Sequence, residues 1–149
     1  MSQKFLDTVM QFASTITDAE RSLAVDLDLN IQGMINLDKE TVREESFIDL
    51  ASATLHQAIS KNEAIITNNV VTDPTKAPTT NTNFSNLRVI VAIPVREIGA
   101  VYVDQHIREG IIARETTDKI QSIIENALDA GKLDITSDEL IAQYETSSV

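Results

Sequence analysis

The chain contains two histidines, four glycines and no cysteine, and these counts limit the chemistry that it can perform. Without cysteine there are no disulfides, thiolate metal sites, thiol nucleophiles or thioether-linked chromophores. His56 and His106 are the only imidazoles, whereas a metal or haem site needs several converging ligands. No serine stands in a GxSxG context, and the glycines form no GxGxxG or Walker-type loop. We therefore expect no intrinsic catalysis and no bound haem, flavin or metal.

A long polar loop offers the best place for a ligand. Asn68–Leu87 includes the run TDPTKAPTTNTN, has no apolar periodicity and contains two of the three prolines. Loops of this length in compact domains are usually functional or disordered. We expect a small-molecule pocket between this loop and a sheet. The residues expected to lie nearest to this pocket are Asp73, Asn83, Phe84, Arg88 and Tyr102.

Two of these residues have a plainer interpretation. Arg88 could hold an anion, or it could be a solvated arginine at the start of a strand. Tyr102 could line the pocket, or it could be a core aromatic residue whose hydroxyl is hydrogen-bonded. His56 is interpreted as a helix residue that lies off the buried stripe. His106 is interpreted as a surface loop residue.

A helix is predicted for the first segment, because Phe5, Val9, Phe12 and Ile16 recur with helical spacing. Leu6 and Met10 widen this apolar stripe, and the wide stripe has two interpretations. It is either a broad core face or a contact with a second protomer. Under the second interpretation, replacing Leu6 and Met10 with glutamate would give a folded monomer.

The next segments predict two strands and a second helix. Strands are expected at 21–27 and 31–38 around a turn with Asp28 and Asn30, with Ile31, Gly33, Ile35 and Leu37 on one side. A helix capped by Ser46 follows and ends near Lys61. Its buried stripe comprises Ile48, Ala51, Leu55, Ala58 and Ile59. A short strand is expected at 64–67.

The second half of the chain predicts a hairpin followed by two helices. Arg88–Arg96 reads as a strand buried on both faces, and Ile98–Asp104 as its antiparallel partner. Pro94 cannot donate to a strand ladder, so it should lie at a bulge or an edge-facing position. A helix follows with buried positions from Ile120 to Leu128 and a stop at Gly131. Thr136 and Glu139 form a capping box that predicts a short helix over 137–144.

These elements predict an α/β (α+β) fold in which helices flank a central antiparallel sheet of about five to six strands. The length of 149 residues and the apolar share of 42% suit a single core. We expect one domain over residues 1–131, with both flanking helices, and a C-terminal tail over 132–149 with a short helix.

The order of these motifs resembles the GAF domain family, which is related to PAS sensors. The matching stretches include ITDAERSLAVDLD, LHQAISKNEAIIT, NVVTDP and LRVIVAIPV, and IGAVYVD is similar to the family's IGVLYLD strand. The resemblance covers 5–130. Three departures leave ligand specificity open: the hairpin after Pro94 is short, Val89 replaces a common serine, and the loop 72–83 is rich in threonine.

The resemblance implies a non-catalytic sensory or regulatory domain in signal transduction that binds a small molecule and forms a homodimer through its terminal helices. The chain lacks the family's cyclic-nucleotide signature and the cysteines of its chromophore-binding and methionine-sulfoxide-reducing members. The alternative is a ligand-free module for dimerisation or protein interaction. An enzyme would need a constellation of residues that the sequence does not contain.

Charge and hydropathy limit the partners further. The net charge is −11 and no Lys/Arg cluster interrupts the acidic surface, which argues against direct nucleic-acid binding. No apolar run approaches the roughly 20 residues of a membrane span, and the N-terminus lacks the apolar block of a signal peptide. We expect a cytoplasmic protein that does not insert into a membrane.

Overall fold

The computed structural model describes residues 2–37, 45–71, 87–106 and 112–146. Five antiparallel strands form one sheet in the order β2-β1-β5-β4-β3. The elements are α1 (Ser2–Thr17), β1 (Arg21–Asp26), β2 (Ile31–Ile35), α3 (Glu45–Lys61), β3 (Ile65–Val71), β4 (Leu87–Val95), β5 (Gly99–His106), α4 (Arg114–Asp129) and α5 (Ser137–Thr146). The predicted α+β fold with an antiparallel sheet flanked by helices is confirmed.

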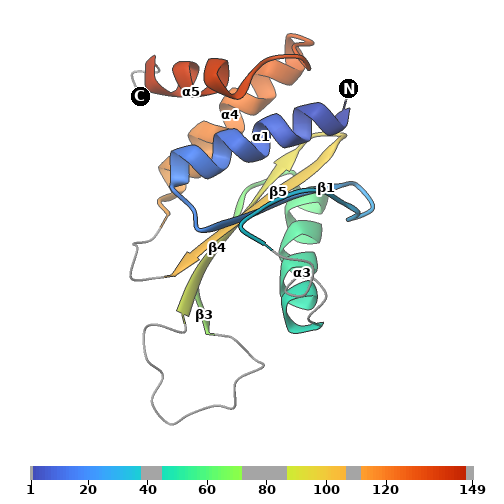
Figure 1. Cartoon of the computed structure of the whole chain (residues 1–149), viewed down its shortest axis with the longest axis vertical. Helices are drawn as coiled ribbons and strands as arrows, with labels where there is room; N and C mark the ends of the chain where they lie inside the picture. Colours follow the sequence, from blue (N-terminus) through green and yellow to red (C-terminus); the bar gives the residue numbers. More distant parts are fainter. Residues whose placement is uncertain (1, 38–44, 72–86, 107–111, 147–149) are drawn as a thin grey trace.

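Helices cover both faces of this sheet. Figure 1 shows α1, α4 and α5 on one side and α3 on the other. Side chains alternate between faces along a strand, so each central strand supplies both layers. In β4, Val91 and Ile93 belong to the cluster under α1 and α4, whereas Ile90 and Ala92 pack toward α3. This confirms the prediction of a strand buried on both faces, which explains its nearly continuous apolar sequence.

The β4–β5 hairpin has the predicted tight turn. The Ile98 N–H donates to the Val95 carbonyl at 2.9 Å, and Glu97 has a positive φ of 66°. Pro94 pairs with Ala100 of β5, but on its other side β3 begins only with the pair Ile65–Ala92. The predicted edge-facing position of Pro94 is therefore confirmed, because its missing N–H falls beyond the end of β3.

The β1–β2 hairpin corrects one expectation. Ile31, Gly33, Ile35 and Leu37 do not share one side, since Ile35 packs with the α1-side cluster and Leu37 with the α3-side cluster. A register shift also places Ile31 opposite Val25 while Gly33 lies opposite Ala24. The physical reason is that a bulge and the positive φ of Asn36, 56°, interrupt strict alternation.

The turn between β1 and β2 is organised by one carboxylate. Asp26 Oδ1 accepts hydrogen bonds from the backbone N–H groups of Asp28 and Asn30, each at 2.9 Å. Its Oδ2 accepts from the side-chain amides of Asn30 and Gln32, each at 3.2 Å. Leu29 takes a positive φ of 67° within this turn. The backbone N–H of Asn30 first of all, then its side-chain amide and the N–H of Asp28, outweigh burial and lower the pKa of Asp26.

The second helix matches its predicted stripe but starts earlier. Ala51, Leu55 and Ala58 are buried, and Ile59 is half-buried. The helix begins at Glu45, so Ser46 lies inside its first turn and is not the cap residue expected from the sequence. A cap at Ser46 implies a helix that starts at residue 47, two residues later than observed, because a serine in the first turn fits the same sequence pattern as a serine at the cap.

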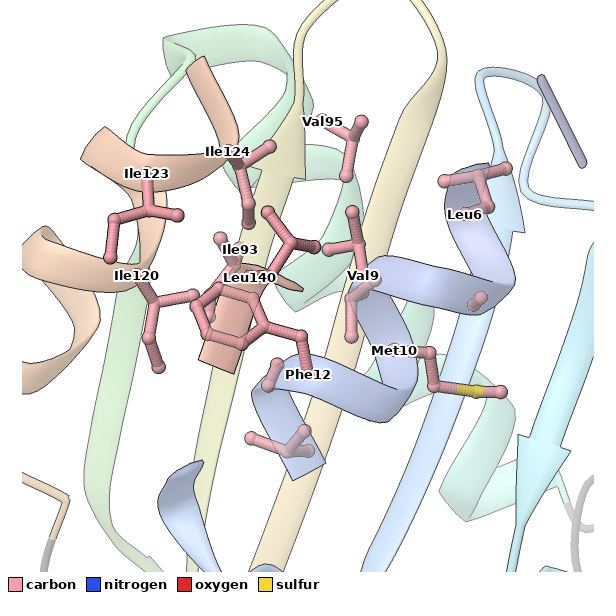
Figure 2. Packing of buried hydrophobic residues seen from close by; sticks show 14 of the residues in the cluster. Leu6, Val9, Met10, Phe12, Ile93, Val95, Ile120, Ile123, Ile124 and Leu140 are labelled. Carbon is pink, nitrogen blue, oxygen red and sulfur yellow. The ribbon is translucent and has the colours of Figure 1, made fainter. Parts of the chain in front are cut away.

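The wide apolar stripe of α1 is covered by the chain itself. Leu6 and Met10 are each only 1% exposed. The Met10 Cε lies 3.0 Å from where a Cβ on Gly33 of β2 would stand. Figure 2 shows Met10 pointing to the β1–β2 side, away from the group that contains Phe12, Ile120 and Leu140. The interpretation that Leu6 and Met10 are surplus to the monomer's core is therefore wrong.

The C-terminal helix α5, inside the predicted tail 132–149, packs against α1 and α4. Leu140 and Ile135 are buried in the same core cluster as Phe12. The predicted cap of α5 forms, because the Glu139 N–H donates to Thr136 Oγ1 at 3.1 Å. Glu139 Oε1 accepts from the Thr136 hydroxyl at 3.1 Å, whereas in a complete capping box it accepts from the backbone N–H of the cap residue. Gly131, with φ +70°, ends α4 as expected, and its N–H donates to the Leu128 carbonyl.

Candidate functional site

Of the five residues predicted to line a pocket, the structure describes Tyr102 in full and Arg88 in its backbone only. Asp73, Asn83 and Phe84 lie outside the described residues. The backbone of Arg88 pairs with His106 in the β4–β5 ladder, but its side chain is also outside the described part of the structure. Tyr102 is described, and it is buried on the face of the sheet that packs against α3.

Tyr102 belongs to a buried polar network. Its hydroxyl donates to Asp104 Oδ2 at 2.6 Å. Arg21 donates two parallel hydrogen bonds to the same carboxylate, from Nε to Oδ1 at 2.8 Å and from Nη2 to Oδ2 at 2.7 Å. Asp104 is fully buried, whereas the Arg21 side chain is 21% exposed. Such a bidentate pair fixes both planar groups in one orientation.

Strand register explains why these three residues meet. β1 and β5 are antiparallel, with Arg21 opposite Asp104 and Leu23 opposite Tyr102. Residues two apart on a strand share a face, so Tyr102 and Asp104 point to the same side. A carboxylate buried on this face requires partners, and Arg21 at the start of β1 is positioned to supply one.

Electrostatics reinforce the contact. Burial by itself would lower the pKa of the Arg21 guanidinium, but the hydrogen bond and the negative charge of Asp104 outweigh it, and the pKa is raised. Arg21 therefore stays positively charged. Three hydrogen-bond donors converge on one buried carboxylate, so the network can hold Tyr102 in a fixed orientation on the α3-facing side of β5.

The Arg21–Asp104 pair of this network lies toward the sheet end that leads to the long loop. Asp104 is opposite Ile90, and two steps further along the ladder Arg88 is opposite His106. β3 ends at the pair Val71–Leu87, next to the same end of β4. Of the predicted residues, the structure places the backbone of Arg88 at this end of the sheet, whereas Tyr102 lies in the middle of β5, opposite Ala92.

Arg21 and Asp104 were missed as site residues when the sequence was read alone. The available signal was the aspartate that ends the apolar run IGAVYVD, two residues after Tyr102. A charged residue that shares the buried face of a central strand needs a counter-ion. The sequence does not say which arginine or lysine supplies it, because Arg21 is 83 residues away.

A second polar network joins α4 to the connection between α3 and β3. Arg114 Nη1 donates to the Ala64 carbonyl at 2.8 Å. Gln121 accepts from the Ala64 N–H through Oε1 at 3.1 Å and donates through Nε2 to the Asn62 carbonyl at 3.0 Å. These side chains form hydrogen bonds with backbone groups where α3 ends and β3 begins. A displacement of β3 would therefore strain these bonds and shift α4.

A shallow depression of about 270 Å³ lies at the other end of the sheet. Its lining includes Leu27, Ile59, Pro94 and Glu97. It adjoins the β4–β5 turn and not the end of β3 and β4 that leads to residues 72–86. It is therefore distinct from the pocket predicted beneath the long loop.

The described part of the chain holds no cluster of three or more His, Asp or Glu side chains that could bind a metal ion. His56 is exposed, and its Nε2 lies 3.5 Å from the Ser60 hydroxyl. His106 has a backbone position at the end of β5, and its side chain is outside the described residues. Within the same described ranges, no helix has the length and apolar character needed to cross a membrane.

Comparison with known proteins adds one informative match. No protein-family model matches this chain, and no curated protein sequence does so. Among solved structures, the chain is similar to a GAF domain/HD domain protein from Geobacter sulfurreducens, with a TM-score of 0.55 and 11% sequence identity. The alignment covers 97% of this chain and 94% of that one.

At 11% sequence identity the structural similarity shows the fold alone, and it extends over 97% of the chain. The five-stranded antiparallel sheet with flanking helices is consistent with this match. The chain therefore has a GAF-like fold.

Proposed function

We propose that this chain is a non-catalytic, GAF-like sensory or regulatory domain that binds a small molecule where β3 and β4 lead into residues 72–86. The observation that carries the proposal is the buried Arg21–Asp104–Tyr102 network, whose Arg21–Asp104 pair lies toward that end of the sheet. Its charged pair lies toward the strand ends that lead to residues 72–86, with Asp104 opposite Ile90, and it holds the phenol of Tyr102 two residues further into the sheet. Polar groups fixed among apolar neighbours are typical of ligand pockets.

The network between α4 and the α3–β3 connection supports a route for the signal. A ligand that shifts β3 would strain the bonds of Arg114 and Gln121 to Ala64 and Asn62. α4 packs against α5, and α5 packs against α1, so a shift of α4 would alter the terminal helices. A role in signal transduction is proposed because of the GAF-like fold and the resemblance to that family. A cytoplasmic location is proposed because the sequence has no apolar run of membrane-spanning length and no signal-peptide pattern.

The alternative function is a ligand-free module that dimerises through its terminal helices. α1, α4 and α5 lie together on one side of the sheet, which would present equivalent helices to a second copy (Figure 1). Since Leu6 and Met10 are buried in the protomer, such a dimer would use the outer faces of these helices. On α1 these faces carry exposed Lys4, Asp7 and Gln11.

Native mass spectrometry of the purified protein distinguishes the two functions. If the domain is a sensor, we expect a protomer that retains a small molecule. Tyr102→Phe should reduce the retained fraction, because it removes the hydroxyl that is fixed by Asp104. Tyr144→Phe is the matched control, since Tyr144 is half-buried against Phe12 on the opposite side of the sheet.

Two results would decide against the sensory proposal. One is an apo protomer that also fails to bind any member of a metabolite library in a thermal-shift screen. The other is equal loss of the retained molecule in both tyrosine variants. A dimer without a retained molecule would favour the alternative.

A further inference from the structure

The outer edge of β2 has the properties of a docking strand. Among the described residues, β2 pairs with β1 and with no other strand. Its sequence, IQGMI, has no charged residue and no proline. Edge strands of stable proteins are usually protected by charge, proline, bulges or short length, because their free N–H and C=O groups can pair with another chain. Here a register shift beside Ile31 gives partial protection, and 33–35 stay in regular register with β1.

Apolar side chains are exposed along the same edge. Leu27 is 49% exposed, Ile31 45% and Met34 36%, and they are the large apolar side chains exposed in the described part of the chain. We refer to these three residues as the hairpin strip. Met34 lies opposite Leu23 and Ile31 opposite Val25, so both continue outward from residues that are buried against α3.

The hairpin strip leads into the shallow depression at the end of the sheet. Leu27 belongs to both the strip and the depression. The depression is also lined by Ile59 of α3 and Pro94 of β4. The apolar surface therefore extends from the edge strand to a hollow of about 270 Å³, which has room for a side chain of a bound segment.

The charges around this edge select the partner. Residues 3–37 contain five acidic residues and two basic residues, and one of the two, Arg21, is already paired with Asp104. Asp7 lies close to the strand, with its Oδ1 3.4 Å from where a Cβ on Gly33 would stand. A second copy of this chain would bring acidic residues against acidic residues, whereas a segment flanked by lysine or arginine would be attracted.

We propose that β2 accepts an extended segment of another protein as a further antiparallel or parallel strand. The segment is apolar at alternate positions and carries lysine or arginine on both flanks. Backbone hydrogen bonds to β2 give affinity, and contacts with the hairpin strip and attraction to the acidic residues of 3–37 give selectivity. This surface lies on the β2 edge of the sheet, whereas the small-molecule site of the proposed function lies where β3 and β4, at the other edge, lead into residues 72–86.

Fluorescence anisotropy with a labelled peptide, KKTVTVTVKK, tests this proposal on the full chain. We expect saturable binding. The same peptide with N-methyl groups on every residue of its TVTVTV core keeps its charge but loses the amide donors of both strand edges, and we expect about tenfold weaker binding. An acidic-flanked version, EETVTVTVEE, should not bind.

Variants locate the contact. Met34→Lys places a charge on the exposed edge and should weaken binding of KKTVTVTVKK by about tenfold or more. Gln57→Lys is the matched control, because it adds the same charge at an exposed position of α3. Circular dichroism of both variants verifies the fold.

Three results would overturn the proposal. Equal binding of the N-methylated peptide would show nonspecific attraction to an acidic protein. Equal weakening by Gln57→Lys would show that charge alone matters. A self-associated protein that Met34→Lys converts to monomer would show that a second copy occupies β2. The first two results leave the small-molecule proposal untouched, because that proposal depends on Tyr102.

Discussion

At the residue scale, the stability of the fold depends on two carboxylates, one buried and one in a surface turn. Asp104 is buried and neutralised by a bidentate arginine, whereas Asp26 lies in a surface turn and accepts four hydrogen bonds. A buried carboxylate without its partner would incur a large desolvation penalty, whereas an exposed one without its hydrogen bonds would return to water. The two sites therefore predict different responses to substitution.

Asp104→Asn should destabilise the fold by roughly 2–4 kcal/mol, somewhat less than a fully buried pair because Arg21 partly reaches solvent. Tyr102→Phe should cost about 1 kcal/mol for one hydrogen bond. Urea unfolding followed by circular dichroism measures both. The control is Arg96→Met, which breaks an exposed ion pair with Asp129 and should change the urea midpoint little. A similar loss in Asp104→Asn and Arg96→Met would contradict the structural role of the buried network.

The pH dependence of Asp26 can be predicted with its sign. Its pKa in the folded state is lowered, so its stabilisation is fully present above the unfolded value of about 3.9 and is lost as pH falls through the lower folded value. Asp26→Asn should therefore lower the free energy of unfolding near neutral pH. The difference from the unmodified chain should shrink below about pH 3.9.

Urea midpoints measured across this range check the Asp26 prediction. Asp28→Asn removes a neighbouring carboxylate of the same turn and serves as the control, since in that turn Asp28 contributes its backbone N–H. A pH-independent gap between Asp26→Asn and the unmodified chain would contradict the assignment.

At the element scale, α5 completes the core. α1 carries an apolar face that is wider than the sheet beneath it requires, and α5 covers the remainder together with α4. Phe12 meets Tyr144 edge to face with ring centroids 6.4 Å apart, and the Lys119 ammonium lies 4.1 Å above the same tyrosine ring. The cap formed by Thr136 and Glu139 fixes where α5 begins.

Leu140→Ala should destabilise the whole domain by about 2–5 kcal/mol, because Leu140 is fully buried between helices. Thr136→Ala should cost about 1 kcal/mol through loss of the cap. Thermal unfolding measures both, and Gln143→Ala, at an exposed position of α5, should stay within about 0.5 kcal/mol. A near-neutral Leu140→Ala would show that α5 is dispensable to the fold.

At the scale of the whole molecule, the homodimer remains a prediction, but its expected test changes. Leu6 and Met10 are buried in the protomer, so replacing both with glutamate would bury two carboxylates and unfold the chain instead of giving a folded monomer. Circular dichroism of the double variant tests this expectation. A folded double variant would contradict the packing of α1 against the sheet.

Sedimentation of the unmodified protein at micromolar concentration tests the dimer itself. If a dimer forms through the terminal helices, Gln11→Trp on the exposed face of α1 should shift the monomer–dimer equilibrium, whereas Gln57→Trp on α3 should not. A monomer under these conditions would exclude the helix-mediated dimer.

The sequence by itself determined most of the elements and the buried faces of α4 and β4. The apolar period of α4, the stop at Gly131, the cap of α5 and the doubly buried run of β4 all follow from residues a few positions apart. Such signals are local, since propensity and periodicity act within one turn or one strand. Antiparallel pairing of β4 and β5 also followed from their short connection.

Only the tertiary structure decided which partner each face meets. Periodicity shows that Leu6 and Met10 are buried, but β2 and the terminal helices reach α1 from distant parts of the sequence. The pairing of Arg21 with Asp104 likewise depends on β1 lying beside β5, and the bulge beside Ile31 depends on how β2 fits β1. A local pattern encodes burial, whereas the identity of the contact is set by long-range packing, in which many sequence-distant residues satisfy one another at once.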